Sequence, residues 1–233
     1  GRDAPSLMAR LEAGSYSYVR ASVATGVAHG KSDAYVSFTE QAQDGFREHA
    51  RQDNQRLFSN FGWRLSPSQV NRVYITAVRT NSELPGNLTK AQLAHDPRAA
   101  APDSVALDQH RNYVLLRIAD KFTWVNNGTR WQASAAWNYK DLDHPIYQVL
   151  DQLSNDLWLS LSADHQGSIG GHDQRLRAGV NFSRGWLNAA SFVNAGGQRG
   201  ALLAQASQIA TNVEAFAEDQ IKISRHATFI LGF

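Results

Sequence analysis

The sequence predicts an all-β fold, an up-and-down antiparallel transmembrane β-barrel, here an incomplete sheet of about eleven strands. Apolar and polar residues alternate with a period of two over unusually long segments. A tilted strand needs about 9–11 residues to cross a bilayer, which is longer than most strands of soluble proteins. The connectors also sort into short turns and longer loops, as they do in outer-membrane barrels. Both observations favour strands that span a membrane.

The expected strands follow from this alternation, read in order along the chain. In the first strand, Leu7 and Leu11 lie on one face and Arg10 lies on the opposite face. A hairpin is predicted where Asn-Asn-Gly joins two alternating segments, because this sequence favours a tight turn. The eleven segments are residues 7–14, 19–24, 34–39, 56–65, 72–77, 111–125, 129–140, 157–163, 175–182, 213–223 and 227–233.

Two acidic residues interrupt the alternation. Asp120 lies among apolar neighbours in residues 111–125, and Asp219 lies on the apolar face of residues 213–223. A carboxylate that faces hydrocarbon costs free energy, and the cost falls toward the membrane interface. We therefore expect these two residues to lie above the apolar band or next to a β-bulge.

The connectors alternate in length along the chain. Short turns are expected at 30–31, 66–68, 126–128 and 224–226, and longer loops at roughly 44–54, 84–109, 143–154 and 185–210. The connector near Ser15 is short and breaks this rhythm. Within the second long loop, residues 89–94 are expected to form a helical turn with Thr89 as its N-cap and Pro97 as its stop.

Composition excludes several classes of protein. The chain has no cysteine, which excludes disulfides and thiolate metal sites, and its formal charge of +2 gives no support to nucleic-acid binding. It has no apolar run long enough for a transmembrane helix. Its six Trp and seven Tyr suit a membrane interface, because their rings are apolar with one polar tip.

Several short motifs, in their order and spacing, resemble TonB-dependent receptors of the siderophore type. The likeness covers essentially the whole chain. It begins with the start of the barrel, and residues 43–49 resemble the end of a barrel strand in that family. The motifs are GRDAP at 1–5, RLEAGSY at 10–16, QDGFREH at 43–49, RTNSELPG at 79–86, LTK at 88–90, DHPI at 143–146 and GGH at 170–172.

The resemblance implies a barrel of about 22 strands with a plug domain in its lumen. It also implies energy-coupled import of a scarce ligand, most often a ferric siderophore, with the TonB complex acting through the plug. On this reading residues 1–233 are one partial barrel domain, without the plug and the later strands. We expect it in the bacterial outer membrane, in contact with lipid, as a fragment that does not transport alone.

Candidate ligand-binding residues lie where the third strand ends. Phe46, Arg47, His49 and Arg51 are expected near the outer rim, where an arginine beside an aromatic ring suits an anionic aryl ligand. A second set of arginines is expected to point into the lumen and to pair with carboxylates such as Glu12 and Glu218. That set is Arg10, Arg56, Arg64, Arg72, Arg130, Arg175 and Arg177.

Other functions remain as alternatives. A passive porin-type barrel and a soluble all-β binding module, such as a sandwich or propeller, share parts of the pattern. An outer-membrane hydrolase would need catalytic machinery, and the sequence has no Gly-x-Ser-x-Gly elbow. The histidine spacings, including Asp143-His144 and His172-Asp173, fit no recognised metal site. We expect no enzyme activity, no cofactor and no metal.

Overall fold

The computed structural model describes residues 6–233, so the GRDAP motif at 1–5 lies outside the described part of the chain. The described residues form one antiparallel sheet of eleven strands, and each strand pairs with its neighbours in chain order. This up-and-down topology and the number of strands confirm the sequence prediction.

The strands lengthen toward the C-terminal side of the sheet. β8, β9 and β10 contain 22, 24 and 25 residues, whereas β2 and β3 contain 12 each. The elements are β1 (Met8–Gly14), β2 (Tyr18–His29), β3 (Ser32–Gln43), β4 (Gln52–Ser66), β5 (Gln69–Ser82), α1 (Lys90–His95), α2 (Pro102–Ala106), β6 (Asn112–Asn126), β7 (Thr129–Pro145), β8 (Gln148–Ile169), β9 (His172–Ala195), β10 (Gln198–Lys222) and β11 (Thr228–Gly232).

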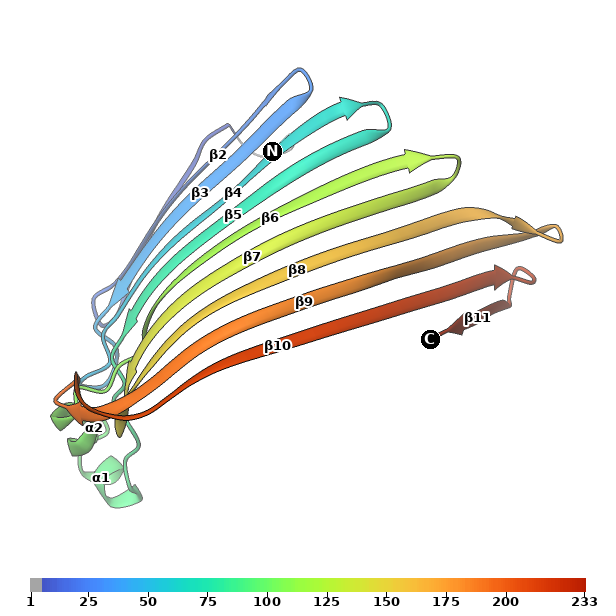
Figure 1. Ribbon diagram of the computed structural model, residues 1–233. Coiled ribbons are helices and arrows are strands. Elements are labelled where there is room, and N and C mark those ends of the chain that lie inside the picture. Colours follow the sequence, from blue (N-terminus) through green and yellow to red (C-terminus); the bar gives the residue numbers. More distant parts are fainter. Residues whose placement is uncertain (1–5) are drawn as a thin grey trace.

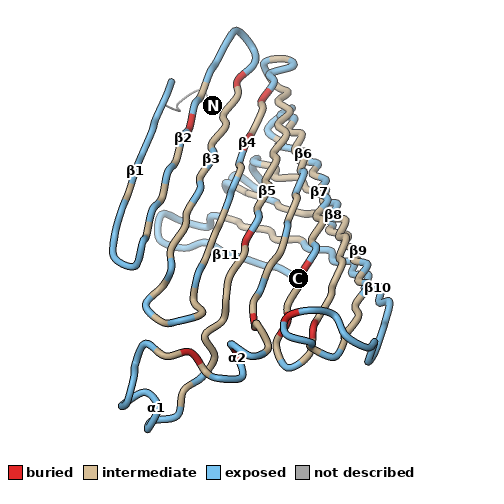
Figure 2. The backbone as a smooth tube through the Cα atoms, turned by 90° about the vertical axis from the view of Figure 1, so that its left-hand side faces the viewer, coloured by how far each residue is buried: buried red, intermediate tan, exposed pale blue. Residues whose placement is uncertain are grey.

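The sheet is strongly bent and open, with both helices at one end of the strands (Figure 1). Figure 2 shows β1–β4 on one side of the bend and β7–β10 on the other. The apolar face is the convex one. In β7, for example, Ala133, Ala135 and Trp137 are exposed while the intervening residues are only half-exposed. Side chains diverge on a convex surface and converge on a concave one, which explains this difference.

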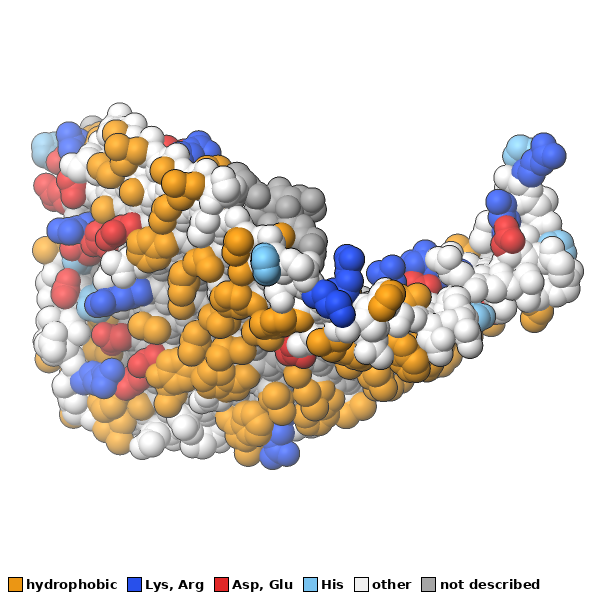
Figure 3. All heavy atoms as spheres, turned by 90° about the horizontal axis from the view of Figure 1, so that it is seen from above, with side chains coloured by type: hydrophobic (Ala, Val, Ile, Leu, Met, Phe, Trp, Pro, Cys, Tyr) orange, Lys and Arg blue, Asp and Glu red, His pale blue; other side chains and the backbone are white. Residues whose placement is uncertain are grey.

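Among residues 6–233, no second layer of the chain covers the convex face. Only Ala24, Ala100, Leu142 and Val149 are buried hydrophobic residues within the described part of the chain, whereas many large apolar residues are exposed. Figure 3 shows hydrophobic side chains gathered in a broad area of the bent sheet, with charged side chains toward its ends. A water-soluble protein rarely exposes so large an apolar patch. This surface suits the interior of a bilayer.

Aromatic residues border the apolar area at both ends of the strands. Trp124 pairs with Trp131 beside the short turn of the β6–β7 hairpin. Toward the loops, Tyr139 aligns with Asn155 and then with Trp186. Trp131 and Tyr139 are separated along β7 by about 26 Å at the usual rise per residue. At the strand tilt of about 35–45° found in outer-membrane barrels, this length covers about 20 Å of an apolar band that is about 25 Å tall. The two sets of aromatic residues therefore lie near opposite borders of the apolar area.

The four short turns lie where the sequence predicts them. At the β6–β7 turn, Asn127 and Gly128 both have positive φ, as a two-residue hairpin of this type requires. Two of the expected long loops are wrong, however. Only residues 146–147 separate β7 from β8, and only Gly196 and Gly197 separate β9 from β10. The strands continue past the apolar band, where the alternation that marks a strand disappears.

Both irregular carboxylates lie on the convex face and are hydrogen-bonded to an amide on the neighbouring strand. Asn71 donates its Nδ2 to Asp120 at 2.8 Å. Gln174 donates its Nε2 to both carboxylate oxygens of Asp219, at 2.9 and 2.8 Å. The register is regular at both positions, which excludes the β-bulge and leaves the other expected explanation, a position above the apolar band, as a prediction. The amides replace part of the solvation that each carboxylate loses.

The concave face carries the predicted lumenal arginines and their partners. Arg175 binds Asp164 through two hydrogen bonds of 2.9 and 2.6 Å. Arg177 lies 3.9 Å from Glu218, and Arg10 pairs with Glu12. These ion pairs confirm that Glu12 and Glu218 help to neutralise the arginines on this face.

The long loop 84–111 contains two short helices. Thr89 caps α1 and forms a capping box with Gln92, as the sequence predicts, and the helix ends before Pro97. The second helix, α2, begins with Pro102 and is not predicted from the sequence. Within residues 6–233, no helix has the length and apolarity to cross a bilayer.

Candidate ligand-binding rim

The four predicted ligand-binding residues lie in the tight loop 44–51, which joins β3 to β4. Gly45 has φ +83°, and a Cβ atom at this position would lie 2.7 Å from the carbonyl oxygen of Ala50. His49 also has a positive φ, of 52°. The loop is therefore folded back closely on itself, and it presents its side chains toward loop 84–111 and toward solvent.

Arg47 binds the protein itself. Its Nε donates to the carbonyl oxygen of Ala99 at 3.0 Å, its Nη1 to that of Gly86 at 2.7 Å, and its Nη2 to that of Pro85 at 3.0 Å. The side chain is half-buried between the two loops. All three guanidinium nitrogens thus hold loop 84–111 against loop 44–51. A further backbone bond from Glu48 to Arg98 strengthens this contact.

His49 makes a similar contact. Its Nε2 lies 2.9 Å from the carbonyl oxygen of Gln109, and only 11% of its side chain is exposed. The same nitrogen lies 3.9 Å from a carboxylate oxygen of Asp108. Because a carbonyl oxygen only accepts hydrogen bonds, Nε2 carries the proton here. His49 therefore braces the far end of loop 84–111.

Arg51 is the exposed cation of the set. Its side chain is 63% exposed, and its Nε donates to Asp53 at 3.1 Å. The hydrogen bond that Arg51 donates to Asp53 and the negative charge of that carboxylate raise the pKa of the Arg51 guanidinium further above its usual value. The Arg51 backbone also bonds to the Glu83 carboxylate. Arg51 remains accessible to an anion, in competition with Asp53.

Phe46 is the exposed aromatic residue of the set, with 46% of its surface accessible. Its ring packs edge-on against Tyr16, with 5.6 Å between the ring centroids. The guanidinium of Arg98 lies over the other ring of this pair, 5.9 Å from the centroid of Tyr16. Aromatic and cationic groups thus gather at the rim, although the cation is Arg98 and was not predicted.

Further loop contacts complete the rim. Asn194, in β9, donates its amide to the carbonyl oxygens of Leu107 and Ile146, at 2.9 and 2.7 Å. Ser104 is buried and donates its hydroxyl to Gln109 at 3.0 Å. Asn194 joins segments that lie 48 and 87 residues away in the sequence, and Ser104 binds within its own loop, so no periodic pattern predicts either contact. The sequence shows only that an amide side chain and a hydroxyl side chain occur near a strand end and in a loop.

The histidines near the rim serve hydrogen bonds between loops. His110 lies 3.6 Å from Asp143 and 3.6 Å from Asp108, and His144 contacts the carbonyl oxygen of His110 at 2.7 Å. Among residues 6–233, no group of three or more His, Cys, Asp or Glu side chains is arranged to hold a metal ion. Of the four predicted residues, Arg47 and His49 therefore hold the loops together, whereas Phe46 and Arg51 are accessible to solvent.

No protein-family model matches the sequence, and no curated protein matches it either. Solved structures do match. The ferric-catecholate import receptor Fiu of E. coli K12 superposes with a TM-score of 0.79 at 13% identity, covering 99% of this chain and 44% of that one. The outer-membrane ferripyoverdine receptor of Pseudomonas aeruginosa gives 0.78 at 10% identity, covering 96% and 36%. The alcaligin receptor FauA of Bordetella pertussis gives 0.75 at 10% identity, covering 95% and 34%.

These matches show the fold: a β-barrel wall of the type found in siderophore receptors. The chain spans less than half the length of each of the three structures. All three are described as receptors and none as an enzyme. At 13% identity or less, the likeness concerns backbone arrangement and assigns no binding residue.

Proposed function

We propose that residues 1–233 form the first part of the barrel of a TonB-dependent receptor in a bacterial outer membrane, and that this receptor imports a ferric siderophore. The observation that carries the proposal is the uncovered apolar convex face, bordered by aromatic rows and extending across the antiparallel sheet. The likeness to siderophore receptors over almost the whole chain supports it.

The concave face supports a lumenal path. It carries paired arginines and carboxylates, as a water-filled or plug-filled barrel interior requires. The proposed energy source is the TonB complex, acting through a plug domain outside this chain. This partner rests on the family resemblance, and the surrounding lipid rests on the apolar convex face.

At the rim, the residues proposed to take part in ligand binding are those predicted from the sequence: Phe46, Arg47, His49 and Arg51. Phe46 and Arg51 would contact the ligand directly, because both are exposed. Arg47 and His49 would act by holding the two loops in place, since their nitrogen atoms already bind carbonyl oxygens. An anionic, aromatic siderophore suits this combination of groups.

The proposal is tested by iron uptake into cells that depend on the gene encoding this chain. Radiolabelled ferric siderophores are offered under iron limitation, with and without an uncoupler that collapses the proton-motive force. Uptake that requires both the gene and the proton-motive force is expected. Uptake unchanged by deletion of the gene would overturn the import function.

A passive porin-type barrel is the second candidate, favoured by the charged side chains on the concave face of the sheet. The two functions differ in their conductance and energy requirement. The purified protein in planar bilayers is expected to show little steady conductance if a plug fills its lumen. Large, stable channels together with energy-independent uptake would favour the porin instead.

A further inference from the structure

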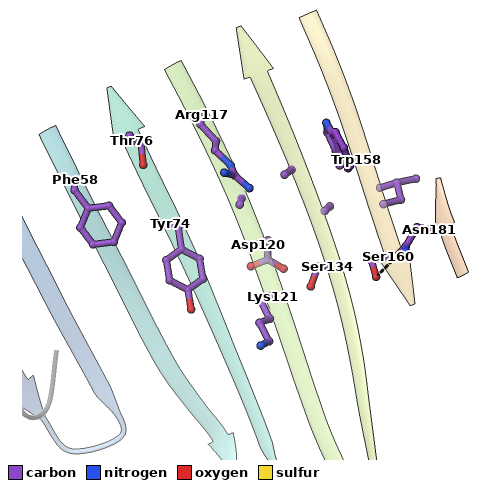
Figure 4. Close-up of a pocket in the computed structure, with 14 residues that line it drawn as sticks. Phe58, Tyr74, Thr76, Arg117, Asp120, Lys121, Ser134, Trp158, Ser160 and Asn181 are labelled. Carbon is purple, nitrogen blue, oxygen red and sulfur yellow. Dashed lines mark hydrogen bonds between the residues drawn. The ribbon is translucent and has the colours of Figure 1, made fainter. Parts of the chain in front are cut away.

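Basic side chains without an ion-pair partner among residues 6–233 occur on both faces of the wall. On the concave face, Arg117 and Lys121 line a hollow of about 480 Å³ between β4 and β9 (Figure 4). The plug of the proposed receptor lies on this side, so these two cations do not indicate a free binding site. Arg184 of β9 is different, because it lies on the convex face, where a plug inside the barrel does not reach it.

The strand register places Arg184 near the loop-side border of the apolar area. It lies directly opposite Leu157 of β8, which in turn lies opposite Trp137 of β7. Two residues further along β9, toward the loops, Trp186 aligns through β8 with Tyr139. A cation that faces hydrocarbon costs free energy, and the cost falls toward the membrane interface. Arg184 therefore lies one step inside the interface, within reach of lipid headgroups.

The side chain of Arg184 extends toward that interface. Its guanidinium lies over the ring of Trp186, 5.4 Å from the ring centroid. Long basic side chains take this course at membrane surfaces, because the stem stays in apolar surroundings while the charge reaches the headgroups. Arg184 is exposed and 37% of the Trp186 surface is accessible, so the stacked pair is open to the membrane.

No carboxylate of residues 6–233 neutralises this guanidinium. The carboxylate of Asp156 lies on the opposite face of the sheet, where a Cβ atom on Gly185 would be 2.6 Å from its Oδ1. Nearer the loops, Asp151 is already paired with Arg199 at 3.1 Å. The side chains beside Arg184 on the convex face carry no negative charge; they are Leu157, Phe182, Trp186 and Thr211.

The polar groups around Arg184 can donate hydrogen bonds. The indole nitrogen of Trp186 is a donor only. Asn155 lies between Trp186 and Tyr139 in the strand register, and its amide has no hydrogen-bond partner among residues 6–233. The guanidinium adds a planar fork of N–H groups that matches a phosphate. A cation and neutral donors thus gather beside apolar surface, which fits a ligand with a phosphate head and a hydrocarbon tail.

We propose that Arg184, Trp186 and Asn155 bind the phosphate of an anionic lipid in the leaflet on the loop side of the membrane. Arg184 donates to two phosphate oxygens, and the acyl chains lie along the apolar surface of Leu159 and Phe182. The inference goes beyond import and rests on only one part of the proposed function, the position of the sheet in a membrane.

The test is native mass spectrometry of the purified protein in detergent micelles that contain dioleoyl phosphatidate. A retained phosphatidate is expected, and dioleoylglycerol, which has the same chains without the phosphate, is expected to bind about tenfold more weakly. Arg184→Gln should weaken phosphatidate binding about tenfold, whereas Arg184→Lys keeps the charge and retains part of the affinity. Trp186→Leu should weaken it about threefold, through loss of the ring and its donor.

Arg79→Gln is the matched control. Arg79 is an exposed arginine on the convex face of β5, opposite Gln55 and Val114, and it has no ion-pair or cation–π partner among residues 6–233. Phosphatidate binding should be unchanged in this variant. Equal losses in Arg79→Gln and Arg184→Gln would overturn the proposal, because the general surface charge would then explain the binding.

Two further results would also overturn it. Equal binding of phosphatidate and dioleoylglycerol would show that the phosphate is not recognised. Displacement of phosphatidate by an equal concentration of inorganic phosphate would show that the site takes free phosphate, since the acyl chains would then contribute nothing.

The assay separates this site from the import function, because lipid binding in micelles needs neither TonB nor an energised membrane. Loss of siderophore uptake with phosphatidate binding intact would count against import alone. Normal uptake without a preference for phosphatidate would overturn the lipid site alone. Each variant is first checked for the heat-dependent gel mobility of a folded barrel, and Arg184→Lys with Trp186→Leu replaces Arg184→Gln as the test if that variant does not fold.

Discussion

The rim and the concave wall contain the same kinds of side chain in different states. At the rim, the guanidinium of Arg47 donates to three carbonyl oxygens and therefore holds two loops together. In the wall, Arg117 and Lys121 stand beside aromatic rings without a partner among the described residues. The difference teaches that residue type alone does not establish whether a basic side chain is held by the protein or remains available.

The largest expected effect concerns the two faces of the wall. Ala135 lies on the convex face and Ala136 on the concave face of the same strand. Ala135→Arg is expected to destabilise the protein in a bilayer by about 2–4 kcal/mol, because the charge would enter hydrocarbon. Ala136→Arg should cost much less. Urea unfolding in lipid vesicles measures both, and equal costs would contradict the assignment of the faces.

The next effect tests the rim. Arg47→Ala removes the donors to Pro85, Gly86 and Ala99 and is expected to destabilise the closed arrangement of the two loops by about 2–3 kcal/mol. Hydrogen exchange of the amides in 84–111 should rise while exchange in β6 and β7 stays unchanged. Unaltered exchange in the loop would show that Arg47 does not brace it.

Asn194→Ala should have a smaller effect at the other end of the same loop. It removes two bonds to the carbonyl oxygens of Leu107 and Ile146 and the bond that Asn194 accepts from the backbone amide of Gly197, worth about 1–2 kcal/mol together. Limited proteolysis is expected to cleave near residues 107–111 faster in this variant. Asn188→Ala, which loses only a contact to Ser207 on the exposed edge, is the matched control.

The smallest effect belongs to Arg51. Arg51→Ala is expected to weaken siderophore binding only slightly, because this exposed guanidinium is screened by solvent and already pairs with Asp53. Its pKa is raised above an already high value, so its contribution should not change between about pH 5 and pH 9. Affinities of the variant and the parent at these two pH values check both points. Unchanged affinity in both Arg47→Ala and Arg51→Ala would remove the rim from the ligand site.

The fold was predictable wherever one face of a strand must be apolar. Trp131, Ala133, Ala135 and Trp137 alternate with polar residues, so the strand and its orientation follow from the sequence. Beyond the apolar band neither face of a strand contacts lipid, so apolar and polar residues need not alternate there. Residues 143–154 and 185–210 were therefore predicted as loops. The pair Gly196-Gly197 was the one available signal that a two-residue turn joins β9 to β10.

The candidate sites were less predictable. The loop carrying Phe46 and Arg51 could be found by residue type and position, but the partners of Arg47 lie 38 to 52 residues away. The hollow on the concave face between β4 and β9 depends on the alignment of Ala119 with Ala136 and on the aromatic residues Tyr74 and Trp158 beside them. Such alignments depend on the register between strands, which the alternation of single segments does not specify.

The most direct test of the account uses the absence of cysteine from the chain. Ala135→Cys and Ala136→Cys are each labelled with a nitroxide in the protein reconstituted into lipid vesicles, and collisions with oxygen and with a water-soluble nickel complex are measured. The account predicts that the label at 135 collides mainly with oxygen, as in lipid, and that the label at 136 does not. Lipid-like accessibility at 136, or equal exposure of both labels to the nickel complex, would contradict a membrane-spanning wall with its polar face inside.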